Sequence, residues 1–183
     1  CSASLRELFG SLTGSKDKEA RAVAKQDLQM AVAGTKLGAN CTPGERQEIQ
    51  EIVARLEAAG GAAEGSLDGL WRLIYTTEDA VHQICNFLPV ELVTQDINLT
   101  DLVVANRIQL ALGCSIEATA SATQVNPKRI AYKFDGLKLQ LGPLALRFGL
   151  RAGGWTEYAF LDGSMRVMRN SRGDTLVLAR VEA

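Results

Sequence analysis

The sequence predicts a mainly β protein of the α+β type, in which two or three helices precede an antiparallel meander of about eight or nine strands. Apolar residues recur at helical spacing through the first 60 residues, whereas from Gly69 onward they recur at every second position. Turn-forming pairs also separate the later runs about every ten residues. These pairs are Asn126-Pro127, Asp135-Gly136, Gly142-Pro143, Gly153-Gly154, Asp162-Gly163 and Arg172-Gly173. Such a meander closes as a barrel or stacks as a sandwich.

The first helical segments lie before residue 40. A short apolar pattern suits one or two turns that would dock on a membrane, on the sheet or on a partner: Leu5, Leu8, Phe9 and Leu12. A longer pattern from Lys16 to about Lys36 predicts a helix that ends at Gly34 and Gly38.

The next helix carries the clearest end signals in the chain. Thr42 suits the N-cap position, Pro43 the first helical position, and Glu45 completes a capping box. One face then repeats apolar side chains at Ile49, Ile52, Val53 and Leu56. Because this stripe needs a surface to cover, we expect residues 1–64 to form a helical extension packed on a sheet domain of residues 65–183.

The strand patterns assign side chains to faces. Trp71, Leu73 and Tyr75 are predicted to share one face of the first strand. Three later runs alternate in the same way, and small residues on one of them leave room for a cavity. Cavity candidates are Tyr75, Ala118, Ala120, Tyr132, Phe134, Leu146, Phe148 and Tyr158. A filled interior and a hollow one that holds a small ligand both fit this pattern.

Charge and composition exclude several classes of function. The net charge of −1 argues against nucleic acid as a partner, since phosphate binding needs a basic excess. Residues 42–117 hold twelve acidic and four basic residues, whereas residues 128–172 hold nine basic and three acidic ones. This asymmetry fits either two solvated faces or a basic side that meets anionic lipid or an acidic partner. No apolar run reaches the roughly 18 to 20 residues of a spanning helix.

No catalytic or metal-binding pattern is visible, and we expect neither a metal nor catalysis. The four cysteines show no metal-ligand spacing, and no nucleophile elbow, phosphate loop or dinucleotide fingerprint occurs. His82 is the only histidine; a Ser-His-Asp arrangement through it is formally open, but exposure at a barrel rim is the prediction. The first residue is Cys1, from which we expect a mature chain whose transit peptide has been removed.

Two stretches resemble the plastid fibrillin (plastid lipid-associated protein) family. Residues 67–77, LDGLWRLIYTT, are similar to the family's opening strand and to the G-x-W start of lipocalin barrels. Residues 160–162 and 166–178 are similar to its closing Y-L-D and R-I-x-R-G-D-x-G-x-x-F-V-L motifs. Phe160 departs from the family's Tyr, and Asn170-Ser171 stand in place of Gly-Asp. The matching signature positions are Gly69, Trp71, Asp162, Arg166, Arg169 and Gly173.

This resemblance implies a lipocalin-like barrel in plastids, peripheral to thylakoid membranes or plastoglobules. It implies non-catalytic binding of a hydrophobic molecule, such as a carotenoid, a prenylquinone or an acyl lipid, with no other cofactor. The alternative is a filled barrel that docks as an assembly subunit on a thylakoid protein complex or an enzyme of isoprenoid metabolism. In lipocalin-like folds, Trp71 packs under an arginine near the closed end, and Arg166 or Arg180 would supply it.

Overall fold

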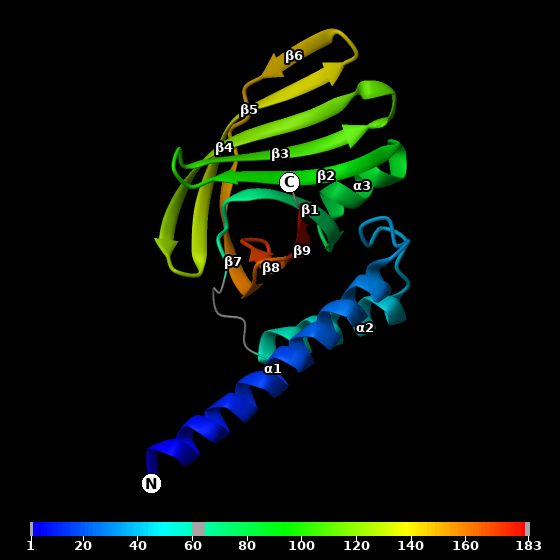
Figure 1. Ribbon diagram of the computed structural model, residues 1–183. Helices are drawn as coiled ribbons and strands as arrows, with labels where there is room; N and C mark the ends of the chain where they lie inside the picture. The colour runs from blue at the N-terminus through cyan, green and yellow to red at the C-terminus, as the bar shows by residue number, and fades with distance from the viewer. Residues whose placement is uncertain (1, 60–64, 182–183) are drawn as a thin grey trace.

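The computed structural model describes the backbone of residues 2–59 and 65–181, and within these ranges the side chains from residue 17 onward (Figure 1). Its helices are α1 (Ser2–Val32), α2 (Pro43–Ala58), α3 (Asp79–Phe87) and the 3₁₀ turn η1 (Ala111–Gly113). Its strands are β1 (Gly69–Thr76), β2 (Val90–Asn98), β3 (Val103–Leu110), β4 (Ser115–Asn126), β5 (Arg129–Leu141), β6 (Leu144–Phe148), β7 (Gly153–Leu161), β8 (Met165–Asn170) and β9 (Thr175–Arg180).

Eight of these strands close into an antiparallel barrel. The order is β4-β3-β2-β1-β9-β8-β7-β5, and an additional pairing of β4 with β5 completes the ring. The ninth strand, β6, pairs only with β5 and lies at the edge of the sheet. The predicted mainly β fold, with a barrel behind N-terminal helices, is confirmed.

The two segments expected before residue 40 form one helix, α1, of 31 residues. The side chains of Leu5, Leu8, Phe9 and Leu12 lie outside the described part, so their docking stays a prediction. In α2 both bonds of the predicted capping box form: the Glu45 N–H donates to Thr42 Oγ1 at 3.3 Å, and the Thr42 N–H donates to Glu45 Oε2 at 2.7 Å. The local signals therefore sufficed to predict where α2 begins.

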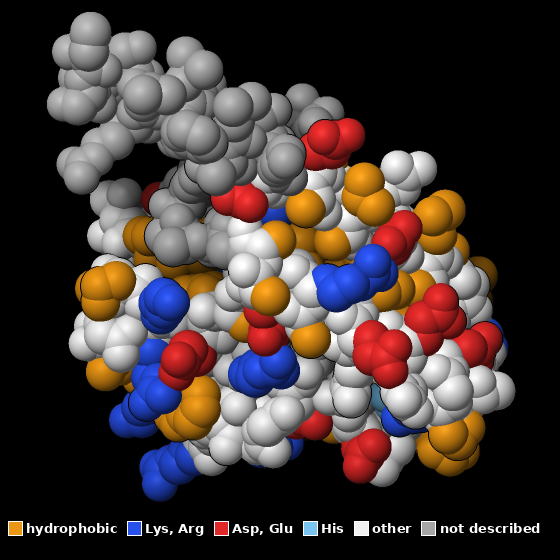
Figure 2. Space-filling model, turned by 90° about the horizontal axis from the view of Figure 1, so that it is seen from below, with side chains coloured by type: hydrophobic (Ala, Val, Ile, Leu, Met, Phe, Trp, Pro, Cys, Tyr) orange, Lys and Arg blue, Asp and Glu red, His pale blue; other side chains and the backbone are white. Residues whose placement is uncertain are grey.

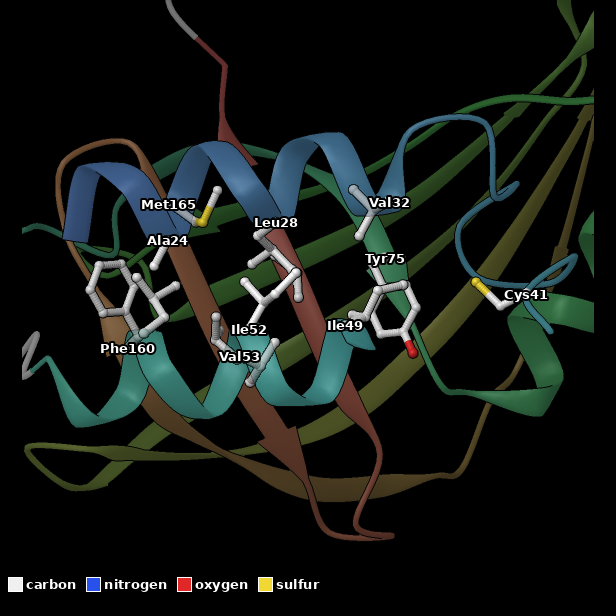
Figure 3. Close-up of a cluster of buried hydrophobic side chains, with 13 residues drawn as sticks. Ala24, Leu28, Val32, Cys41, Ile49, Ile52, Val53, Tyr75, Phe160 and Met165 are labelled. Atoms are coloured by element: carbon white, nitrogen blue, oxygen red, sulfur yellow. The ribbon is translucent and has the colours of Figure 1, made fainter. Parts of the chain in front are cut away.

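Both helices cover the outer side of the barrel wall (Figure 3). Leu28 of α1 and Leu56 of α2 are fully buried, and they pack with the outward side chains of four strands. Those strand residues are Tyr75, Phe160, Met165, Val167 and Val177. Arg169 adds a charged contact at 2.6 Å from Glu57 of α2. The helices and the strands thus share one apolar core, which lies outside the barrel and leaves its interior to other side chains.

Two β-bulges decide which aromatic residues enter that outer core. The pairing of β1 with β9 shifts register between Leu73 and Tyr75, and the pairing of β7 with β8 shifts between Tyr158 and Phe160. Each extra residue reverses the alternation of faces. Leu73 and Tyr158 therefore face inward, whereas Tyr75 and Phe160 face the helices. The prediction that Trp71, Leu73 and Tyr75 share a face is wrong for Tyr75.

Beyond the barrel, β4, β5 and β6 continue as a flared sheet on the side far from α1 and α2 (Figure 1). The predicted turn at Asp135-Gly136 is wrong, because β5 runs through it as a strand of 13 residues. A register shift against β4 accommodates the extra residue, and Asp135 Oδ2 accepts a bond from the Ser121 N–H at 3.1 Å. Residues 129–133 of β5 pair with β7, and residues 137–141 pair with β6.

Candidate ligand cavity

The barrel encloses a cavity of about 260 Å³. This volume is near the lower end of the range for small-molecule sites, so the space suits a small molecule or one part of a larger one. Its wall is mostly apolar and includes Leu73, Val93, Ile97, Val104, Ile108, Ile130, Met168, Leu176 and Leu178. Polar side chains lie at two levels: Thr94, Gln95 and Asn106 along the wall, and Glu78, Thr156, Asn170, Ser171 and Arg172 toward one end.

Four of the eight cavity candidates line this space: Ala120, Tyr132, Phe134 and Tyr158. Ala120 is only 1% exposed and pairs with Phe134 across β4 and β5. The rings of Tyr132 and Phe134 lie edge to face, with their centres 5.4 Å apart. Burial raises the pKa of Tyr158 to about 12, so its phenol stays neutral at physiological pH. Ligand binding by these residues stays a prediction.

The other four candidates lie elsewhere. Tyr75 packs under α1 and α2 because of the bulge in β1. Ala118, Leu146 and Phe148 belong to the flared sheet. There, residues 137–140 of β5 pair with β4 on one side and with β6 on the other, beyond the barrel. Leu146 and Phe148 are 38% and 51% exposed. Alternation places these side chains on one face correctly, but the strands have left the barrel at that height, so they do not line the cavity.

The closed end of the barrel is built around Trp71. Its ring is fully buried, and its Nε1–H donates to the carbonyl oxygen of Leu67 at 2.9 Å. Arg166 lies over the ring with its guanidinium carbon 4.5 Å from the ring centre, and Arg180 does so at 4.2 Å. Each contact of this kind contributes about 0.5 to 2 kcal/mol. Both arginines that the sequence offered for this role therefore contact Trp71.

The two arginines differ in their surroundings. Arg180 is partly exposed and donates to the backbone carbonyl oxygens of Ser66 and Asp68. Arg166 is fully buried, and its Nη2 donates to Gln95 Oε1 at 2.5 Å. Its Nε and Nη1 have no hydrogen-bond partner within the described ranges. Burial lowers the pKa of Arg166 to about 9, with Tyr158 acting in the opposite direction. The guanidinium therefore still carries its charge at neutral pH.

The open end of the cavity carries a half-buried carboxyl group. Glu78 precedes α3, and its Oε1 accepts a bond from Asn170 Nδ2 at 2.7 Å. Burial raises the pKa of Glu78 above its ordinary value of 4.5, although the bond from Asn170 opposes this. Asn170 Oδ1 also accepts from the N–H groups of Arg172 and Asp174, which shapes the β8–β9 turn. This rim is thus ordered by side-chain hydrogen bonds.

His82 of α3 is buried, which contradicts its predicted exposure. Its Nε2 lies 2.9 Å from the carbonyl oxygen of Thr76 and 3.3 Å from that of Leu37. Because a carbonyl oxygen only accepts, Nε2 carries the proton. The ring therefore ties α3 to the end of β1 and to the loop after α1, which is a structural role.

The remaining signature residues support turns and contacts between elements. Asp162 accepts bonds from the N–H groups of Ser164 and Met165, both at 2.8 Å, and pairs with Lys25 of α1 at 2.6 Å. Gly69 and Gly173 have φ angles of 109° and 87°, which favour glycine. Arg169 donates to Glu57 and to Thr175 Oγ1. None of these four signature residues lines the cavity.

Sequence reasoning missed the polar pair on the cavity wall. Gln95 Nε2 donates to Asn106 Oδ1 at 2.7 Å, which joins β2 to β3. Both residues occupy inward positions of strands whose other inward positions are apolar, such as Ile97 and Ile108. A polar side chain at an otherwise apolar inward position was the signal that could have identified them.

A second hollow, a surface groove of about 600 Å³, lies between the end of α1, β1, β2 and α3. It is larger than the barrel cavity, but it lies outside the barrel wall. Charged side chains of Lys36, Arg72 and Glu91 contribute to its walls. The enclosed and mostly apolar cavity is therefore the better site for a hydrophobic ligand.

The charged surface matches the asymmetry of the sequence only in part. From below, basic side chains gather mainly on one side and acidic ones mainly on the other (Figure 2). Arg129 pairs with Glu157 and Arg107 with Glu117, each at 2.5 Å. Within the described residues, no set of His, Cys, Asp and Glu side chains is arranged to hold a metal ion. None of the helices described there combines the length and apolar character of a membrane span.

Comparison with known proteins identifies the family. The PAP_fibrillin family model matches residues 22–179, which include the C-terminal part of α1, all of α2 and every strand of the barrel except the last residue of β9. The chain belongs to the PAP_fibrillin family. The match runs through both stretches that carried the resemblance. No solved structure matches the chain.

Among curated PAP_fibrillin relatives, the probable plastid-lipid-associated protein 11, chloroplastic, of Arabidopsis thaliana is 25% identical over 148 residues, which cover 75% of this chain and 69% of the relative. The plastid-lipid-associated protein, chloroplastic, of Citrus unshiu is 32% identical over 124 residues, or 61% of this chain and 38% of the relative. The probable plastid-lipid-associated protein 12, chloroplastic, of Arabidopsis thaliana is 26% identical over 168 residues, or 78% and 41%. The chain thus spans about two fifths of the length of two of these relatives.

Proposed function

We propose that this protein binds a hydrophobic small molecule, such as a carotenoid, a prenylquinone or an acyl lipid, without catalysis, at the surface of thylakoid membranes or plastoglobules. One observation carries the proposal: the barrel is hollow, and its cavity has a mostly apolar wall. Transfer of an apolar chain from water into such a space contributes about 25 cal/mol per Å² of buried area. The family and the printed names of its lipid-associated relatives agree with this function.

An apolar rim on the flared sheet supports contact with a lipid phase. Exposed apolar side chains form this rim on three neighbouring segments at one end of the sheet, outside the cavity lining. They are Phe87 at the end of α3, Leu88 after it, Leu112 in η1, and Leu141 and Leu144 beside the β5–β6 turn. The Ala111 N–H donates to the Pro89 carbonyl oxygen at 3.0 Å, which holds two of these segments together. An exposed apolar rim of this kind suits contact with a lipid surface.

Basic side chains lie close to this rim. Lys138 and Arg147 are directly paired across β5 and β6. Within the described residues, neither of them forms an ion pair, unlike Arg107 and Arg129. Cations beside an apolar rim suit the anionic headgroups of a membrane surface.

The test is native mass spectrometry with lipid extraction, applied to the protein purified from plastids. We expect a co-purifying isoprenoid or acyl lipid that disappears in Ala120→Trp, because the new ring fills the cavity beside Phe134. Ser121→Trp is the matched control, since Ser121 is exposed at the next position of β4. Thermal melts establish that both variants are folded. Wild-type protein that carries no lipid, or lipid that persists in Ala120→Trp, overturns the proposal.

A second function, docking on a thylakoid protein complex or an enzyme of isoprenoid metabolism, is favoured by β6. This strand lies at the sheet edge and exposes Leu144, Leu146 and Phe148. Such an edge can pair with a strand of a partner. If docking is the function, the lipid-free protein retains a partner through purification, and Leu146→Lys with Phe148→Lys releases it while Ala120→Trp does not.

A further inference from the structure

The buried guanidinium of Arg166 is incompletely paired. Its Nη2 has one acceptor, Gln95 Oε1, while its Nε and Nη1 have none. These are the only buried side-chain nitrogen or oxygen atoms without a partner in the part of the chain that the structure describes. Buried donors are nearly always hydrogen-bonded, and buried charges are nearly always paired. This exception therefore indicates a missing acceptor.

The guanidinium lies behind the floor of the barrel cavity, and Arg166 itself is not among the described residues that line this space. Its hydrogen-bond partner Gln95 and its cross-strand neighbour Leu178 both line the cavity, as does Met168 two residues further along β8. Trp71 closes the barrel beneath it. N–H donors and a positive charge thus lie directly behind the wall of a mostly apolar space.

No carboxylate of the described lining neutralises this charge at the floor. Among the described lining residues, Glu78 is the only acidic one. It lies at the open end of the cavity and accepts a hydrogen bond from Asn170. Gln95 and Asn106 bind each other, so one amide oxygen of the wall is already occupied. A ligand oxygen that enters the cavity floor beside Gln95 can supply the remaining acceptor.

We propose that the cavity selects an amphiphile that binds head first, with an oxygen acceptor at its polar end hydrogen-bonded to Arg166. The head is a carboxylate or a ketone or quinone carbonyl, and the apolar chain runs past Ile108 and Phe134 toward the flared sheet. This inference rests on the proposed function, because it names the class of ligand that the same cavity takes. A pure hydrocarbon leaves the donors of Arg166 unpaired and binds more weakly.

The experiment uses the full chain and N-phenyl-1-naphthylamine, an uncharged fluorescent probe of apolar cavities. Decanoic acid, 2-decanone and dec-1-ene compete for it; they carry a charged acceptor, a neutral acceptor and no acceptor. We expect at least one of the first two to displace the probe about 10- to 100-fold more tightly than dec-1-ene. The order of decanoic acid and 2-decanone distinguishes a carboxylate from a carbonyl ligand.

Two variants and a matched control assign the preference to Arg166. Arg166→Met removes the donors, and Gln95→Glu gives the guanidinium an internal carboxylate without shortening the side chain. Both are expected to abolish the preference for an acceptor head. Gln95→Glu serves if Arg166→Met does not fold. Arg180→Met is the control, because Arg180 also stacks on Trp71 but donates its bonds to backbone carbonyls.

The outcomes separate the two proposals. A probe that does not bind wild-type protein, or that none of the three compounds displaces, overturns the proposed function. A probe displaced equally by all three compounds leaves the proposed function standing and overturns head-first recognition. Head-first recognition is also overturned if Arg180→Met loses the preference for an acceptor head to the same degree as Gln95→Glu. The preference would then depend on the arginines stacked on Trp71 and not on the unpaired donors of Arg166.

Discussion

Leu73 and Tyr75 are two residues apart in β1 but lie on opposite sides of the barrel wall. Leu73 lines the cavity, whereas Tyr75 packs with Leu28, Ile49 and other residues under α1 and α2. The bulge between them changes the face. The wall of this barrel therefore separates side chains available to a ligand from side chains that hold the helices in place.

This separation predicts different effects of substitutions at the two positions. Tyr75→Ala removes a ring that is 1% exposed and is expected to lower the free energy of unfolding by about 3 to 5 kcal/mol. Urea unfolding measures this loss. At urea concentrations below its unfolding transition, Tyr75→Ala should still bind N-phenyl-1-naphthylamine. Leu73→Trp should instead block the probe in a folded protein. Loss of probe binding by folded Tyr75→Ala contradicts the assignment of faces.

Glu78 predicts a stability that depends on pH. Burial raises its folded-state pKa above the ordinary 4.5, so its contribution is fully present below pH 4.5 and is lost as pH rises through the folded pKa. Glu78→Gln removes the charge and keeps an acceptor for Asn170. The melting temperature of the variant relative to wild type should therefore increase between pH 4 and pH 7.5. A constant difference across this range would mean that the carboxyl group is not desolvated at the rim.

Asp162 predicts the opposite dependence. Burial acts to raise its pKa, but bonds from Lys25, Ser164 and Met165 outweigh burial and lower it below the ordinary 3.8. Its contribution is therefore present above pH 3.8 and is lost as pH falls through the folded pKa. Asp162→Asn should cost about 1 to 3 kcal/mol at pH 7, and less near pH 2.5, in denaturant unfolding. Lys25→Met, which leaves the turn bonds intact, should cost less; an equal cost would assign the whole effect to the ion pair.

The cap of α2 predicts a smaller effect. Thr42→Ala removes the acceptor for the Glu45 N–H and should cost about 1 kcal/mol. Thr42→Ser keeps a hydroxyl oxygen at that position and is the control. Urea unfolding of both variants checks the prediction. If the serine variant loses as much stability as the alanine variant, the methyl group of Thr42 and not its hydroxyl supports the helix start.

Much of the fold was predictable because its signals are local. The capping box and Gly34 (φ 76°) depend on residues within one turn of each helix end, and the two-residue period from Gly69 identified the strands. Gly142 and Gly173 likewise stand at turns that the sequence predicted. Local backbone preferences act over only a few residues. A short segment of sequence therefore carries these signals without any tertiary contact.

The site was only half predictable, because a bulge depends on the strand across from it. Alternation alone assigned Tyr75 to the cavity, and it had no means to detect the extra residue that turns the ring toward the helices. It grouped Leu146 and Phe148 with Phe134, although these strands leave the barrel above the point where β7 stops pairing with β5. The buried ring of His82 likewise bonds to backbone carbonyl oxygens that lie 6 and 45 residues away in sequence, so local sequence carried no sign of its burial.

By itself, the side-chain pattern determined that this chain forms helices followed by an antiparallel meander, and the family resemblance implied a barrel with Trp71 and an arginine at its closed end. Only the tertiary structure decided that the barrel is hollow and that Arg166 is buried behind its floor with two nitrogen atoms unpaired. The physical reason is that strand type follows from local side-chain pattern. Cavity volume and hydrogen-bond satisfaction, in contrast, are sums over side chains that meet only after the chain has closed on itself.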